Sequence, residues 1–157
     1  MSIETVLAQL IIEEDNSNNT LIFGLASNAR EYFEKELTSS SGTMSSVRAM
    51  VNSRTSIKVL FLSKLQYLFM YLTKLEVDDA NTSTRYTSMI FYGLDELLKC
   101  DKQSLCAQQV RLANLIFNVT FKLKNKHELE VQFVPSLPYE CSDLNRLEQY
   151  WREMTSH

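Results

Sequence analysis

The sequence predicts an α/β fold, with a mainly parallel sheet and helices on both of its faces. Short apolar runs alternate with helical patterns along the 157 residues, the order that right-handed β-α-β crossovers produce. The central unit is an apolar run at Val59–Leu62, a long apolar helix, and a second apolar run at Met89–Tyr92. Runs that are apolar on both faces are typical of strands buried between two helical layers.

Each element in the N-terminal part has its own signal. Thr20–Leu25 is a short apolar segment that predicts a strand, and Ser27 or Asn28 is placed to cap a helix after it. The serine-rich stretch 38–46 predicts a mobile loop. Before the strand, helical spacing of apolar residues predicts an amphipathic helix from Ile3, Val6, Leu7, Leu10 and Ile11.

The remaining elements follow in the same alternation. Ser63 is expected to cap a helix whose leucine stripe faces the sheet, and residues 78–87 form a polar connection. Apolar residues between positions 105 and 119 mark another long helix. Glu128–Phe133 alternates polar and apolar side chains, which predicts a half-exposed strand at a sheet edge. Ser142 is expected to cap a last helix.

Composition limits the class of protein. We expect one domain over residues 1–157, because no linker divides the pattern. The net charge is −3 and the pI about 5.4, without the basic excess of a chain that binds nucleic acid alone, so we expect DNA contact mainly through partners.

Acidic residues near the start argue against a targeting peptide, and no apolar run is long enough for a membrane span. Three cysteines without metal or redox spacing indicate reduced thiols.

The residues needed for nucleotide chemistry are missing. The chain has three glycines, none followed by lysine and no two within five residues, so it contains neither a phosphate-binding loop nor GxGxxG. Met89–Tyr92 runs into Gly93, where a nucleotide-binding strand would end in an acidic magnesium ligand. Asp95 is expected to cap its own turn, with a displaced metal ligand as the minor alternative. The chain has just two histidines, and the parts of a catalytic triad or of a histidine metal site are lacking, so no cofactor, metal or catalytic residue is predicted.

Two helices carry more apolar surface than one core face needs. Tyrosine and methionine are favoured at interface cores, so we predict protein contacts there, with burial inside this chain as the alternative. The edge strand Glu128–Phe133 offers a further route to a partner through its free backbone groups. The candidate interface residues are Tyr67, Met70 and Tyr71 on the central helix and Leu147, Tyr150, Trp151 and Met154 on the last.

A basic turn is predicted from Lys122 to His127. Its three lysines, Lys122, Lys124 and Lys126, are candidates for a weak DNA contact, and a solvated loop is the alternative interpretation.

The central unit resembles a known family. The specific block is Val59–Leu62, Lys64, Tyr67-Leu68 and Met70–Thr73, followed after a polar gap by Phe91–Leu94. Looser matches are Asn19–Ile22, Ala29–Tyr32, Arg146-Leu147 and Trp151. On these residues the chain resembles the small RecA-like subunit of the budding-yeast Shu complex, a paralogue of the eukaryotic strand-exchange recombinase.

The resemblance implies a minimal RecA-like core that lacks functional Walker motifs. It also implies a nuclear, non-catalytic adaptor that helps the recombinase assemble on DNA in homologous recombination and error-free damage tolerance. Such a subunit bridges a RecA-like partner pair to a zinc-binding SWIM-domain subunit. Two alternatives remain open from the residues: a small α/β enzyme with a pocket at the strand ends, near Gly24–Asn28, Ser63 and Gly93–Asp95, or a weak DNA binder through Lys122–Lys126.

Overall fold

The computed structural model describes residues 3–12, 19–35, 57–77, 86–100 and 104–155. Its sheet contains β1 (Thr20–Leu25), β2 (Ile57–Leu62), β3 (Ser88–Tyr92) and β4 (Glu130–Val134) in the spatial order β2-β1-β3-β4. All three strand pairs are parallel. The predicted α/β class is therefore confirmed, and β4 lies at a sheet edge as its alternating residues predicted.

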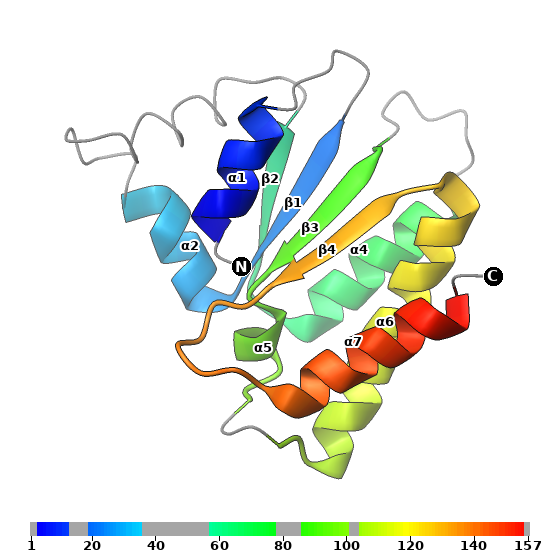
Figure 1. The fold of residues 1–157 in the computed structure, drawn as a ribbon. Coiled ribbons are helices and arrows are strands. Elements are labelled where there is room, and N and C mark those ends of the chain that lie inside the picture. The colour runs from blue at the N-terminus through cyan, green and yellow to red at the C-terminus, as the bar shows by residue number, and fades with distance from the viewer. Residues whose placement is uncertain (1–2, 13–18, 36–56, 78–85, 101–103, 156–157) are drawn as a thin grey trace.

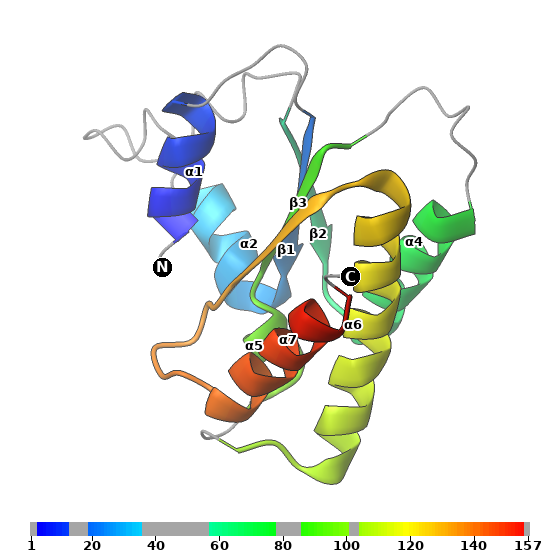
Figure 2. The same ribbon diagram turned by 45° about the vertical axis from the view of Figure 1, so that its right-hand side comes forward.

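Helices cover both faces of this sheet (Figures 1 and 2). One face carries α1 (Ile3–Ile12) and α2 (Ala26–Lys35), and the other carries α4 (Leu65–Val77) and α6 (Ala107–His127). α7 (Ser142–Thr155) packs on α6, and the short α5 (Leu94–Leu97) directly follows β3 at the carboxyl ends of the strands. The arrangement is a four-stranded parallel sheet between helical layers, consistent with a minimal RecA-like core.

A row of aromatic rings crosses the sheet on its α4–α6 face. Phe23, Phe91 and Phe133 are register partners in β1, β3 and β4, and neighbouring rings stack with centroids 4.8 Å apart. Tyr71 from α4 meets one end of the row edge-on, and Phe117 from α6 meets the other. Each such contact contributes about 0.5–1.5 kcal/mol beyond simple burial. The neighbouring helices α4 and α6 thereby pack on one continuous aromatic core.

The smaller core lies on the opposite face, under α1. Leu7 is fully buried there, and Ile3 and Val6 are nearly so, packing with Ile22 of β1 and Ile90 of β3. The predicted helix is therefore confirmed, with Ile3, Val6 and Leu7 buried and Leu10 partly buried; the side chain of Ile11 lies outside the described part of the chain. The predicted serine-rich loop at 38–46 and most of the polar connection at 78–87 lie outside the described residues.

The predicted basic turn was wrong. Residues 122–127 are the end of α6, which stops at Glu128, where the backbone is left-handed with φ 55°. Lysines in the last turns of a helix are favoured by the negative end of its dipole, so a basic run does not require a loop. The strand after it consequently begins at Glu130 instead of Glu128.

The predicted serine caps also shift. α7 begins at Ser142 itself, and the carbonyl of Cys141 accepts the hydrogen bond from Asn145 N. α4 begins at Leu65, and the carbonyl of Lys64 accepts from Tyr67 N and Leu68 N, so Ser63 lies one residue too early.

Replacing Thr120 by valine should stabilise the protein. Thr120 is fully buried in α6, and among the described residues its Oγ1 is the buried side-chain polar atom without a hydrogen-bond partner. An unpaired buried hydroxyl is costly, so the nearly isosteric Thr120→Val should raise the free energy of unfolding by about 1 kcal/mol in urea denaturation. The control Thr120→Ser keeps the hydroxyl and loses a methyl group, so it should lower stability. A valine variant less stable than wild type would contradict the assignment.

Candidate functional site

Open α/β sheets bind ligands at the carboxyl ends of their strands. Here a carboxylate of the chain itself lies at the N-terminus of α2, beside the end of β1. α2 begins directly after β1, with Ala26 in the left-handed region at φ 66° and no loop between the elements. The carboxylate of Glu96 accepts hydrogen bonds from Asn28 N at 3.0 and 3.3 Å, and Ser27 Oγ lies 3.4 Å from it. Ser27 and Asn28 thus lie inside α2, and Glu96 supplies the cap predicted for them. A negative group at a helix N-terminus is stabilising, and in nucleotide-binding folds a phosphate takes that place.

Asp95 performs a different role from the predicted cap. It lies within α5, whose N-cap is Gly93, and it is only 4% exposed. Its carboxylate accepts hydrogen bonds from Ser136 N and Leu137 N, both at 3.1 Å, which fastens the loop after β4 to the end of β3. Asp95 and Glu96 together form the strand-end clamp, tying α5 to the loop after β4 and to α2. Within the described part of the chain, no cluster of three or more histidine, cysteine or carboxylate side chains could hold a metal ion.

Gly93 permits this clamp to close. Its φ is +98°, and a Cβ added there would lie 2.4 Å from the carbonyl oxygen of Leu25. The ends of β1 and β3 therefore approach each other more closely than any side chain would allow.

Gly93→Ala should destabilise the protein by about 1–3 kcal/mol or more, because it combines a left-handed backbone with a clash against main chain. The free energy of unfolding from urea denaturation measures the loss. Gly24→Ala provides a contrasting case, since its added Cβ would lie 2.7 Å from the side chain of Phe61 and would meet no main-chain atom. Equal stability of Gly93→Ala and wild type would show that the strand ends do not approach as described.

The three cysteines differ in their surroundings. Cys100 and Cys141 are buried and their thiols are hydrogen-bonded, whereas Cys106 is exposed ahead of α6. Burial, followed by the neighbouring Cys141, raises the pKa of Cys100 to about 12.

Thiol labelling should separate these cysteines. A raised pKa keeps Cys100 protonated at about pH 8, and the thiolate is the reactive form, so a disulfide reagent should modify Cys106 rapidly and spare Cys100 until the chain unfolds. Peptide mass spectrometry identifies the modified residue, and Cys106→Ser is the control that should abolish the fast phase. Fast modification of Cys100 in the folded protein would contradict its burial.

The candidate residues on α4 divide between two faces. Tyr67 and Met70 point to solvent, with 47% and 65% of their surface exposed. Tyr71 is half-buried, packs edge-on against Phe23 and is hydrogen-bonded to Tyr86. The buried stripe of α4 is formed by Leu68 and Leu72, as its leucine spacing predicted.

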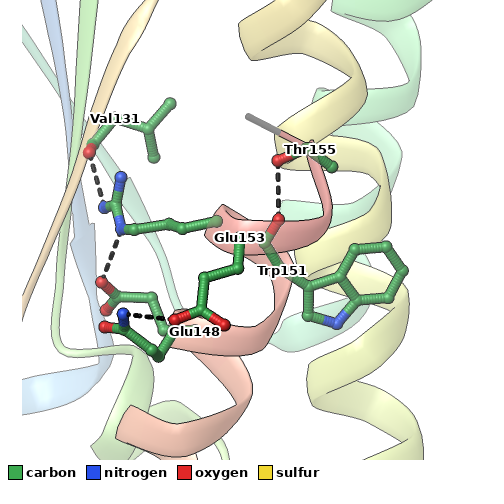
Figure 3. Close-up of polar contacts among 7 residues, drawn as sticks. Val131, Glu148, Trp151, Glu153 and Thr155 are labelled. Carbon is green, nitrogen blue, oxygen red and sulfur yellow. Dashed lines mark hydrogen bonds and ion pairs between the residues drawn. The ribbon is translucent and has the colours of Figure 1, made fainter. Parts of the chain in front are cut away.

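The candidate residues on α7 divide in the same way. Tyr150 and Met154 are 54% and 60% exposed. Leu147 and Trp151 pack against the core, and Trp151 Nε1 donates a hydrogen bond to Asn114 Oδ1 of α6 at 2.9 Å. Figure 3 shows Trp151 on the side of α7 that faces away from Val131 and the sheet edge.

Exposed apolar residues extend beyond the predicted set. Val77 at the end of α4 is 73% exposed, and Leu115 of α6 is 45% exposed. Leu115 follows the same apolar spacing as half-buried Leu112 and buried Ile116, so periodicity alone did not reveal its exposure. The exposure of Val77 could have been predicted from the sequence, because Val77 is the last apolar residue of a helix whose leucines already form a core stripe.

The three candidate lysines occupy different environments at the end of α6. Lys122 is exposed, Lys124 lies over the ring of Phe121 at 5.9 Å, and Lys126 donates to the carbonyl of Glu76 on α4. Two of the three therefore make contacts within the chain.

These features define a class: a RecA-like α/β domain whose sequence lacks a glycine-rich phosphate loop and whose α2 N-terminus is filled by Glu96. Comparison with known proteins gives the family. The family model described as "suppressor of HU sensitivity involved in recombination protein 1" matches residues 4–156. The Saccharomyces cerevisiae protein of that description is 32% identical over 155 residues, covering 96% of this chain and 97% of the relative. The chain belongs to this family.

None of the described helices is long and apolar enough to cross a membrane.

Proposed function

We propose that this protein is a non-catalytic adaptor subunit of a Shu-type complex, acting in homologous recombination and error-free tolerance of DNA damage. Family membership supports a role in recombination, because the matching description names it. The adaptor promotes assembly of the recombinase filament and bridges a RecA-like partner pair to a zinc-binding SWIM-domain subunit. Residues 1–157 form its single domain, and its place of action is the nucleus.

The observation that carries the adaptor proposal is the exposed apolar surface on two helices. Tyr67 and Met70 on α4, and Tyr150 and Met154 on α7, expose between 47% and 65% of their surface. Large aromatic and methionine side chains are enriched at the cores of protein interfaces, and their exposure in an isolated chain favours association. We therefore assign partner contacts to these four residues, while Tyr71, Leu147 and Trp151 support them from beneath.

The strand ends support a non-catalytic role. Glu96 and Asp95 are the carboxylates that a nucleotide or metal site could use there, and both accept hydrogen bonds from the backbone of this chain. A small enzyme with a strand-end pocket would need these groups to face a substrate. The net charge of −3 supports DNA contact mainly through partners.

Co-expression with the RecA-like pair and the SWIM-domain subunit tests the proposal. Affinity purification and sizing should yield a stoichiometric complex that is more soluble than the isolated chain. Met70→Glu and Met154→Glu should each reduce recovery of a partner by about tenfold or more, since a charge would be buried in an apolar contact.

The matched controls are Lys74→Glu on α4 and Gln149→Glu on α7, which place a glutamate at exposed polar positions of the same helices. They should assemble like wild type, and circular dichroism should show every variant folded. A monodisperse chain that ignores all partners would refute the adaptor role.

A further inference from the structure

A cavity of about 430 Å³ opens beside the free edge of β4, between the loop after this strand and the start of α7. Its lining includes the apolar side chains of Leu94, Phe117 and Leu144, which are almost completely buried. Its charged lining residues are Asp95, Glu140 and Glu148, and none of the described lining residues is basic. A cavity with an apolar interior and an acidic lining matches a long aliphatic side chain that ends in a cation.

Backbone geometry supplies an acceptor at this cavity. Glu130 N donates to Thr87 O, and Val134 O accepts from Gly93 N, so residues 130 and 134 direct their main-chain groups toward β3. By the alternation of a strand, Val131 and Phe133 direct theirs to the open side. Phe133 lines the cavity, so its carbonyl lies at the sheet edge beside it.

Arg152 shows which group this edge accepts. Its Nη2 donates to the outward carbonyl of Val131 at 2.7 Å, and its Nε pairs with Glu148 Oε2 at 2.9 Å (Figure 3). Its guanidinium also lies over the ring of Phe121 at 5.5 Å. An outward carbonyl, a carboxylate and an aromatic ring thus hold one guanidinium in cis.

A carbonyl, a carboxylate and an aromatic ring also lie near one another two residues further along β4. The carbonyl of Phe133 follows that of Val131 on the open side. Glu140 provides the carboxylate, whose Oε1 also accepts a hydrogen bond from Asn145 Nδ2 at 2.7 Å. Tyr139 provides the ring, and its hydroxyl is anchored to the carbonyl of Cys100 at 2.5 Å. Guanidinium groups pair with carboxylates through several N–H donors and stack on aromatic faces, which an ammonium does less well.

We propose that the β4–α7 cavity is a docking pocket for an arginine side chain presented by a partner protein. This deepens the adaptor proposal and rests on it for the existence of the partner. The aliphatic stem lies against Leu94, Phe117 and Leu144, and the guanidinium binds Glu140 and the edge carbonyl of Phe133.

Titration of the full-length ¹⁵N-labelled chain with capped arginine (N-acetyl-arginine amide) tests the pocket directly. Saturable shifts should concentrate on the amides of Phe133, Tyr139 and Asn145. Capped citrulline, which has nearly the same shape without the charge, should bind about tenfold more weakly. Equal binding of citrulline or capped lysine, or shifts spread away from the cavity, would overturn the proposal.

Two variants locate the effect. Glu140→Gln should weaken arginine binding about threefold or more by removing one charge, with little change in shape. Asn145→Trp, at an exposed lining position, should block the cavity and also removes the hydrogen bond from Asn145 Nδ2 to Glu140 Oε1. Gln149→Trp is the matched control, exposed on α7 but outside the lining, and should bind like wild type. Arginine binding by a folded Asn145→Trp chain at wild-type strength would overturn the site.

Reconstitution separates this inference from the adaptor proposal. If wild type assembles with its partners and Asn145→Trp does so equally well, the adaptor role stands and the pocket is not a partner contact. If Asn145→Trp loses a partner that Gln149→Trp retains, the pocket is supported. If capped arginine binds as described but wild type assembles with no partner, the adaptor role fails while the arginine site remains.

Discussion

Stacking of three phenylalanine rings across β1, β3 and β4 is the interaction on which the rest of this structure depends. Phe23, Phe91 and Phe133 occupy the same register position, and their neighbouring centroids are 4.8 Å apart. A slip of one residue in any strand would turn its ring to the opposite face, so the row fixes the register of three strands at once. Tyr71 and Phe117 extend the row to the helices, so the positions of α4 and α6 follow from the same packing.

The second constraint acts at the carboxyl ends of the strands. Asp95 and Glu96 come from one short helix, yet they bind the loop after β4 and the first turn of α2. A nucleotide-binding relative would leave backbone N–H groups at this edge for phosphate. Here the chain's own carboxylates use those donors, so the edge stabilises the fold. Large apolar side chains are exposed instead on the outer faces of α4 and α7.

The two outer helices show how one element serves both core and surface. On α4, Tyr71 joins the aromatic row while Met70, its neighbour in sequence, is 65% exposed. On α7, Trp151 bonds to Asn114 while Tyr150 is 54% exposed. Adjacent residues on a helix point about 100° apart, so a pair of large apolar residues places one inside and one outside. A partner surface on such a helix is held rigid by the packing directly beneath it.

The sequence by itself determined the α/β class, the positions of the four strands and the absence of a phosphate loop, because hydrophobic periodicity and glycine spacing are local properties. It also indicated the surplus apolar residues on α4 and α7, but not the exposure of Leu115 on α6. Only the tertiary structure decided which of Tyr67, Met70 and Tyr71 turns inward, because the extent of the core stripe depends on the elements packed against it. Lys122–His127 became helix for a similar reason, since Leu123 is buried within that run. Ser136, Asn28 and Val131, which bind Asp95, Glu96 and Arg152 respectively, lie 41, 68 and 21 residues away from them in sequence. No local pattern specifies contacts at such separations.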